Sequence, residues 1–213
     1  MTLNYDFEGI KRRVNPATCG LLASVAALVN VALLKIATHP VDPLDVEALA
    51  HLDSGVVPWL VASLVVDLAF YLLLIPVVWG LGGAVARGAG VVYALVGAVG
   101  ATLLLRHWPV ALYAADAERF IRITQVVYFD LWNGVGAVAA FVWWIAVARR
   151  TRDTHRIFAA FTLTMGILSL LDAVSFRFIS FEAGRWVLMA VLGLLVVWPA
   201  AAALGPLRRQ ARK

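Results

Sequence analysis

The chain has 213 residues, of which 62% are hydrophobic and only 15% are charged, and its mean hydropathy is +0.87. Soluble domains average roughly 45–50% apolar and about 25% charged residues, so this composition excludes an ordinary soluble domain. The net charge of +5 does not indicate nucleic-acid binding, because the basic residues cluster between apolar segments and no recognition motif accompanies them. The single cysteine, Cys19, excludes an intrachain disulfide and a redox pair.

Six apolar segments are each long enough to cross a bilayer as a helix, which takes roughly 17–25 residues. Their apolarity is continuous and does not alternate with period two, which favours helices over barrel strands. We therefore predict an all-α integral membrane bundle of six transmembrane helices in a single membrane domain, residues 1–213, with helices near residues 18–37, 56–81, 90–108, 124–148, 157–178 and 185–204. Just before the fourth segment, residues 115–122 are predicted to form a short interfacial helical turn in which Glu118 and Arg122 are spaced to pair.

The basic residues alternate between the two sides of this bundle. One side has 12 Lys and Arg residues (11–13, 87, 149, 150, 152, 156, 208, 209, 212 and 213), and the other has six (35, 106, 119, 122, 177 and 185). The loop between the first two helices carries Asp42, Asp45, Glu47 and Asp53 instead. Because cytoplasmic loops hold the excess of Lys and Arg, both termini are predicted to be cytoplasmic. The expected location is the inner (cytoplasmic) membrane of a bacterial cell, as a multi-pass protein.

Three aspartates, Asp67, Asp130 and Asp172, lie within the apolar segments. A carboxylate near the bilayer centre opposes insertion by roughly 2.5–3.5 kcal/mol on translocon scales, so such residues usually face a partner or water. From the helical rise of 1.5 Å per residue, Asp67 falls near the middle of its helix, and the other two fall roughly 7 Å toward the external side. The buried polarity is therefore expected in the outer half of the bundle.

Polar or aromatic residues recur on the same helix face as each aspartate, as Ser63 and Tyr71 do with Asp67 at a spacing of four residues. These faces are expected to pack inward, because exposing them to lipid is costly. We predict that they converge on a ligand-binding cavity that opens to the outside and is lined by Asp67, Tyr71, Asp130, Trp132, Asn133 and Asp172. Lys35 and Arg177 are the candidates for counter-charge.

Three functions remain compatible with this polar cluster. The protein binds or translocates a small or lipid-like ligand, or serves as a membrane subunit of a complex. Alternatively it is an intramembrane enzyme in which an aspartate acts as general acid or base on a lipophilic substrate. In the third interpretation the cluster is purely structural and consists of interhelical hydrogen bonds, each contributing about 0.6 kcal/mol.

The four histidines, His39, His51, His107 and His155, lack metal-ligand spacing, and the chain has no catalytic or cofactor-binding motif. We therefore expect no metal and no cofactor, and we favour the non-enzymatic functions while leaving the enzyme open. The expected partners are membrane lipids, a lipophilic or small ligand, and either further copies of this chain or a larger membrane complex, with no nucleic acid.

Two segments resemble an uncharacterised bacterial family of six-helix membrane proteins, a domain of unknown function. They are residues 65–68, Val-Val-Asp-Leu, with the aromatic and Leu-rich end of the second helix that follows, and residues 166–172, Gly-Ile-Leu-Ser-Leu-Leu-Asp, with Ser175 and Phe176 beyond them. The Gly- and His-containing pattern of that family's fourth helix is not matched by residues 129–134, Phe-Asp-Leu-Trp-Asn-Gly. The resemblance implies a six-helix fold and no particular activity.

Overall fold

The computed structural model describes residues 14–208, with the side chains of Phe176, Arg177 and Phe181 left out. Within this range the protein is helical throughout and has no strand. Six helices are long and apolar enough to cross a membrane, namely Pro16–Thr38, Ser54–Leu81, Ala84–Tyr113, Ala117–Thr151, Arg156–Val174 and Glu182–Leu207. The prediction of an all-α bundle with six membrane-spanning segments is thereby confirmed.

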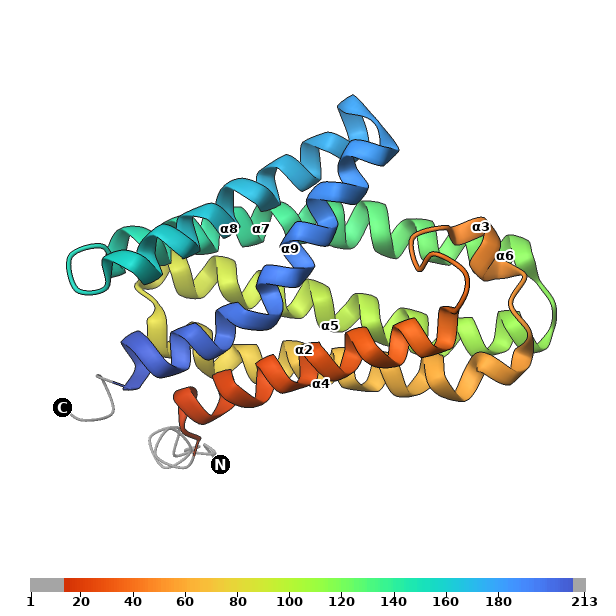
Figure 1. Ribbon diagram of the computed structural model, residues 1–213, viewed down its shortest axis with the longest axis horizontal. Helices are drawn as coiled ribbons and strands as arrows, with labels where there is room; N and C mark the ends of the chain where they lie inside the picture. Colours follow the sequence, from red (N-terminus) through yellow and green to blue (C-terminus); the bar gives the residue numbers. More distant parts are fainter. Residues whose placement is uncertain (1–13, 209–213) are drawn as a thin grey trace, which may run out of the picture.

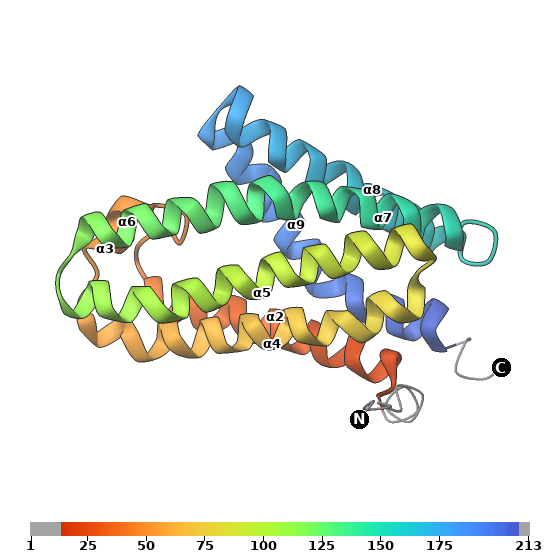
Figure 2. The same ribbon diagram turned by 180° about the vertical axis from the view of Figure 1, so that it is seen from behind.

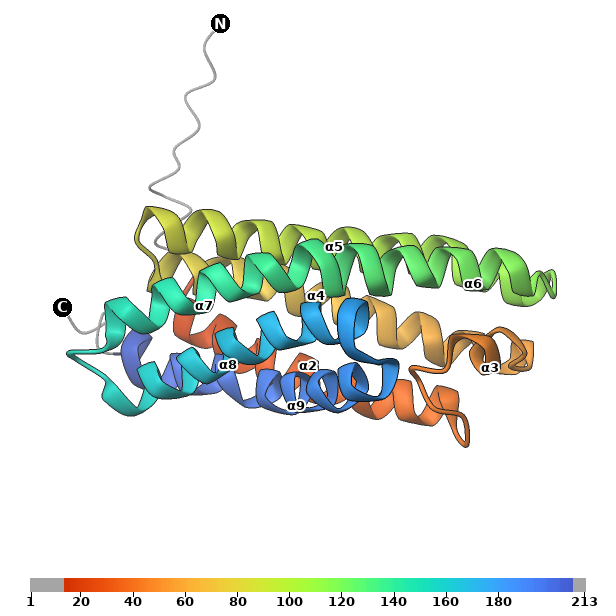
Figure 3. The ribbon, with the colours of Figure 1, turned by 90° about the horizontal axis from the view of Figure 1, so that it is seen from above.

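The helices run up and down the bundle side by side (Figure 1). In chain order they are α2 (Pro16–Thr38), α3 (Val46–Ala50), η1 (Ser54–Val56), α4 (Val57–Leu81), α5 (Ala84–Tyr113), α6 (Ala117–Gln125), η2 (Val126–Gly136), α7 (Ala137–Thr151), α8 (Arg156–Val174), η3 (Ser175–Ile179), α9 (Phe181–Ala202) and η4 (Ala203–Leu207). Of the short elements, η1 is a 3₁₀ helix, and η2, η3 and η4 are π-helices. From behind, α5 lies between α4 and α7 (Figure 2). From above, α5 and α7 form one side of the bundle, and α2 and α9 form the other (Figure 3).

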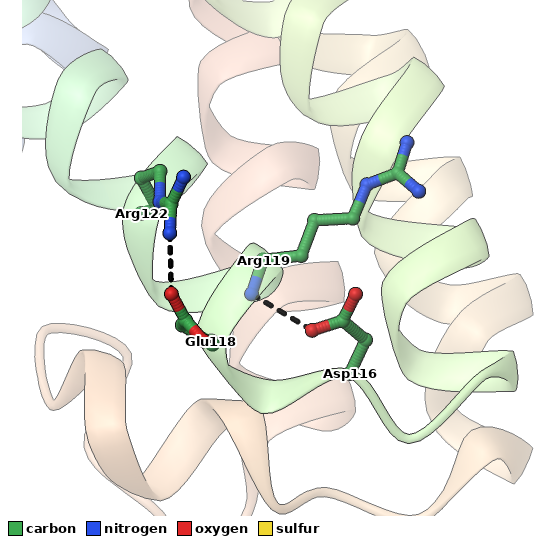
Figure 4. Close-up of polar contacts among 4 residues, drawn as sticks. All are labelled: Asp116, Glu118, Arg119 and Arg122. Atoms are coloured by element: carbon green, nitrogen blue, oxygen red, sulfur yellow. Dashed lines mark hydrogen bonds and ion pairs between the residues drawn. The ribbon is translucent and has the colours of Figure 1, made fainter.

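The fourth spanning helix begins earlier than its apolar run predicts. Asp116 caps it, because its Oδ1 accepts a hydrogen bond from the backbone N–H of Arg119 at 3.0 Å (Figure 4). From this cap α6, η2 and α7 continue without a break, so residues 115–122 are not a separate interfacial turn. The expected pairing of Glu118 with Arg122 is present as an ion pair on the exposed face of α6 (Figure 4). Hydropathy missed these first turns because they are polar outside their buried stripe.

The two ends of the bundle differ in charge. Pro16 and Leu207 both pack against Gly80, so the first and last helices meet at one end of the bundle. We call this the basic end, because its described residues include Arg87, Arg149, Arg150, Arg152, Arg156 and Arg208. The opposite end, with α3, α6 and the loop of residues 39–45, is called the acidic end (Figure 1). The basic residues 11–13, 209, 212 and 213 lie outside the described residues.

The basic half of the bundle contains a dense aromatic core. The side chains of Trp143, Trp144 and Trp198 are fully buried, and their ring centroids lie 5.0–6.1 Å apart. The indole N–H of Trp198 donates to Thr162 Oγ1 at 3.0 Å, which ties α9 to α8. Phe158 packs on Trp198 at 5.8 Å. We call this cluster of buried rings, Trp143, Trp144, Phe158 and Trp198, the aromatic floor.

Helix α9 is held to α2 near its end. Proline at position 199 has no N–H, and the N–H of the next residue, Ala200, donates to the hydroxyl of Ser24 at 2.9 Å. Beside this contact, a Cβ placed on Gly20 would lie only 2.7 Å from the carbonyl oxygen of Pro199. Glycine at position 20 therefore permits the close approach of the two helices.

This close approach predicts the effect of one methyl group. Replacing Gly20 by alanine should destabilise the protein by about 1–3 kcal/mol, because the new Cβ overlaps the α9 backbone and the helices must separate. Thermal unfolding of the purified protein in detergent measures the change. Gly193→Ala in α9 is the matched control, since a Cβ there meets no atom within 4 Å and should cause no loss of stability. Equal melting temperatures for the two variants would contradict the proposed close packing.

Candidate functional site

A cavity of about 190 Å³ lies inside the bundle. It extends from Pro43 and Leu44, in the loop at the acidic end, to Trp144 in the aromatic floor. Most of its wall is apolar, and its polar and aromatic lining consists of Asn30, Ser63, Asp67, Tyr71, Tyr93, Trp108, Tyr128, Phe129, Trp132, Asn133, Trp144, Ser169 and Asp172. None of the described residues that line it is a lysine, an arginine or a histidine.

Asp67 is held by a short chain of hydrogen bonds between α2 and α4. The hydroxyl of Ser63 donates to Asn30 Oδ1 at 2.5 Å, and Asn30 Nδ2 donates to Asp67 Oδ1 at 2.9 Å. Ser63 and Asp67 lie four residues apart on α4, so both face the same residue of α2. The arrangement fixes one oxygen of the Asp67 carboxyl and leaves the other outside the chain of bonds.

Asp172 is the second carboxyl in the cavity wall. Its side chain is only 4% exposed, and its Oδ1 atom has no hydrogen-bond partner among the described residues. The neighbouring hydroxyl of Ser169 donates to the backbone carbonyl of Met165 at 3.0 Å and so stays within its own helix. Buried polar atoms are nearly always paired in native proteins, so this oxygen calls for a partner that none of the described residues supplies.

One aromatic wall of the cavity is formed by Tyr71 and Tyr93, which we call the tyrosine pair. Their rings make an edge-to-face contact at 5.9 Å, and Tyr93 also packs against Trp144 of the aromatic floor at 5.7 Å. Tyr71 fits because Gly97 faces it on α5, where a Cβ would lie 2.1 Å from the ring. Tyr93 lies within electrostatic range of both Asp67 and Asp172, which line the same cavity.

The other aromatic wall is formed by Tyr128 and Trp132 of the π-helix η2, which we call the stacked rings. Their centroids lie 5.3 Å apart, and Tyr128 packs on Trp108 of α5 at 6.3 Å. The Nε1 atom of Trp132 points at Gly100, since a Cβ on that glycine would lie 2.3 Å from it. Long π-helical segments are uncommon and are frequently found at functional sites, which agrees with the position of η2 beside the cavity.

The predicted site residues fall into two groups. Those that line this single cavity are Asp67, Tyr71, Trp132, Asn133 and Asp172. Asp130 does not line it; its side chain is exposed and lies in a shallow groove on the outer surface, which Asn133 also borders. Asp130 is two residues from Tyr128 and two from Trp132, so it lies roughly 200° around the helix from Tyr128. Its side chain is therefore on the opposite side of the helix from the cavity. Lys35 is exposed and outside the cavity lining, and the side chain of Arg177 lies outside the described residues.

The predicted set left out other lining residues, among them Asn30, Tyr93 and Tyr128. Asn30 is the single amide in the first apolar segment, so the argument that singled out the aspartates applies to it as well. Tyr93 and Tyr128 carry no comparable signal, because a tyrosine in an apolar segment is as common in an ordinary helix interface as in a ligand site. Their role follows only from the packing of α5 and η2 against α4.

Comparison with protein-family models, with curated protein sequences and with solved structures found no match. The resemblance to the six-helix family therefore stays a prediction. Among residues 14–208, no three histidine, cysteine, aspartate or glutamate side chains are grouped closely enough to hold a metal ion.

The bonds around Asn30 predict a measurable stability effect. Asn30→Leu keeps the size of the side chain but leaves the Asp67 carboxyl and the Ser63 hydroxyl without a partner, so it should lower stability by about 1–3 kcal/mol. Thermal unfolding in detergent gives the change. As control, Thr102→Ala removes a hydroxyl that is exposed and bonds only to Ala98 O in its own helix, and we expect little change. An unaltered melting temperature in Asn30→Leu would exclude the bridging role of Asn30.

Proposed function

We propose that this protein is a multi-pass membrane protein that binds a small or lipid-like ligand in the cavity, with entry from the acidic end. The observation that carries this proposal is the carboxyl of Asp172, which is buried in the cavity wall with one oxygen that no described residue bonds. A ligand that donates a hydrogen bond to this oxygen satisfies it. The apolar lining with a few convergent polar groups is typical of small-molecule sites.

A purely structural role explains only part of the polar cluster. The bonds from Ser63 to Asn30 and from Asn30 to Asp67 join two helices and agree with such a role. Asp172 forms no such bond within the described residues, although its insertion into the membrane is costly. Helix packing alone does not offset the cost of burying this carboxyl, whereas a hydrogen bond from a ligand in the cavity does.

The size and shape of the cavity support a ligand that is small or enters by one end. An engineered protein cavity of about 150 Å³ holds a benzene molecule, so about 190 Å³ accommodates a compact molecule or the end of a longer chain. Toward the basic end the cavity is bordered by Trp144, which packs within the aromatic floor. Binding needs no movement of these rings, whereas translocation across the membrane needs them to separate. Binding is therefore the step that this geometry supports best, and translocation is a further step.

The charges of the two ends support one orientation. The excess of arginine at the basic end favours the cytoplasmic side for that end, and the acidic end then faces outward. Since Pro43 and Leu44 at the acidic end line the cavity, entry from that end would bring the ligand from outside the cell or from the outer leaflet.

This orientation predicts which residues a membrane-impermeant thiol reagent reaches. In a background without Cys19, Asp45→Cys should react in intact cells, because residue 45 is exposed in the loop at the acidic end. Arg152→Cys, exposed at the basic end, should react only after the cells are permeabilised. Labelling of position 152 but not of position 45 in intact cells would reverse the orientation.

Filling the cavity should abolish binding. We use hydroxyadamantane, a compact neutral amphiphile, and measure its heat of binding to the protein in phosphatidylcholine nanodiscs, with empty discs as background. Ala137→Phe and Ser169→Phe place a ring inside the cavity and should reduce the heat above background to near zero. The matched controls Val138→Phe and Leu170→Phe add the same ring at the exposed neighbouring positions and should bind like the unaltered protein.

Two results would contradict the proposed function. One is no heat above that of empty discs for the unaltered protein. The other is equal heat for the cavity-filling and the control variants, which would show that the probe partitions into lipid. Because the two filling substitutions lie on different helices, the failure of one variant to fold leaves the other to decide.

A further inference from the structure

We infer that the ligand of this cavity carries an organic ammonium group on an apolar body. The inference rests on the proposed function, because it names the chemical class of the ligand for that same cavity. It follows from the charge of the lining, from the arrangement of the aromatic rings around the carboxyls, and from the atoms that are left without partners.

The charge of the lining excludes an anionic ligand. Asp67 and Asp172 are the two acids in the described lining, and no lysine, arginine or histidine there offsets them. An anion in this space would meet two carboxyls and no cationic partner, which is costly in a site of low dielectric constant. An ammonium group would meet the opposite charge that a buried cation requires.

The aromatic rings are placed to surround such a cation. Tyr71 and Tyr93 on one wall and Tyr128 on the other all lie within electrostatic range of Asp67. A cation bound to this carboxyl therefore lies in a cavity that the rings of all three tyrosines line. The faces of such rings attract ammonium groups, and the attraction increases when the cation is shielded from water.

The unpartnered atoms point to a hydrogen-bond donor on the ligand. Oδ1 of Asp172 is an acceptor without a partner among the described residues, and Asp67 has one oxygen outside its bond to Asn30. The unpartnered indole N–H of Trp132 is directed at Gly100 and not into the cavity. The indole N–H of Trp144, deep in the cavity, remains as a donor for a polar atom elsewhere on the ligand.

The surroundings of the entrance agree with a cationic ligand. Pro43 and Leu44, which line the cavity, belong to a segment, residues 39–53, that contains Asp42, Asp45, Glu47 and Asp53 and no lysine or arginine. Negative charge at an entrance raises the local concentration of cations. Asp42 also forms a 2.7 Å ion pair with Arg185, which holds this loop against the start of α9.

The experiment compares three probes that share one apolar body. Aminoadamantane, hydroxyadamantane and adamantane carboxylate are titrated into the protein in phosphatidylcholine nanodiscs, and the heats are corrected with empty discs. We expect the amine to bind at least about tenfold more tightly than the alcohol, because hydrogen bonds between ionised groups are roughly twice as strong as neutral ones. The carboxylate should give no heat above background.

Substitution of the carboxyls tests the assignment of the ammonium site. Asp172→Asn and Asp67→Asn should each lower the affinity for the amine by about tenfold or more while changing that for the alcohol by less than about twofold. Unaltered binding of the alcohol shows that each variant is folded. Asp130→Asn is the matched control, because Asp130 lies outside the cavity and its loss should leave both affinities unchanged.

The outcomes separate the two proposals. If the alcohol or the carboxylate binds as tightly as the amine, and Ala137→Phe abolishes that binding, the ammonium inference is overturned and the proposed function stands. If none of the three probes responds to Ala137→Phe, the proposed function itself fails. A final comparison replaces part of the phosphatidylcholine by phosphatidylethanolamine: weaker amine binding identifies a lipid headgroup as the source of the ammonium, and unchanged binding identifies a soluble amine. Both results uphold the inference.

Discussion

Every polar side chain that enters the bilayer core must find its partner inside the bundle, because lipid supplies neither hydrogen-bond donors nor acceptors. Several buried polar groups of this protein meet that requirement by joining helices. Asn30 bonds to Asp67 between α2 and α4, and the indole N–H groups of Trp108 and Trp198 each donate to a threonine hydroxyl of another helix. Asp172 is the exception among the described carboxyls, and it lies where the helices separate enough to leave a cavity. The same requirement therefore arranges the helices and marks the place where an outside partner is needed.

Glycines on α5 determine where aromatic rings are packed and where space remains. Gly97 leaves room for the ring of Tyr71, and Gly100 leaves room for that of Trp132, so both rings approach the backbone of α5 closely at the edge of the cavity. Toward the basic end the rings of Trp143 and Trp144 fill the interior completely. The bundle thus combines a densely packed half with a half that keeps an open space beside two carboxyls. This division agrees with a protein that holds a ligand near one membrane surface while the rest of the bundle maintains the fold.

The sequence predicts the helices well because bilayer thickness sets the length of each apolar run, and that length is read directly. It also predicts both carboxyls of the cavity lining, because burying a carboxyl in such a run is costly unless it faces the interior. The sequence did not predict the direction in which some side chains point around their helix axis, or which distant segments pack together. Asp130 was predicted to line the cavity, but it lies on the outer surface, because the side of η2 that carries Tyr128 and Trp132 is the one that faces the cavity. The π-helical winding of that segment has no signature in the hydrophobic pattern. Tyr93 and Tyr128 were missed because only the packing of distant segments brings them to the carboxyls.

Helix α9 belongs both to the densely packed half of the bundle and to the wall of the cavity. The helix is attached to α2 at Pro199, where the two backbones touch, and its residues from Leu188 to Leu195 form one side of the cavity. The width of the cavity therefore depends on where a single helix lies, and that helix packs against both α2 and α8. Near the start of α9, the ion pair of Arg185 with Asp42 connects the same helix to the loop whose Pro43 and Leu44 line the cavity.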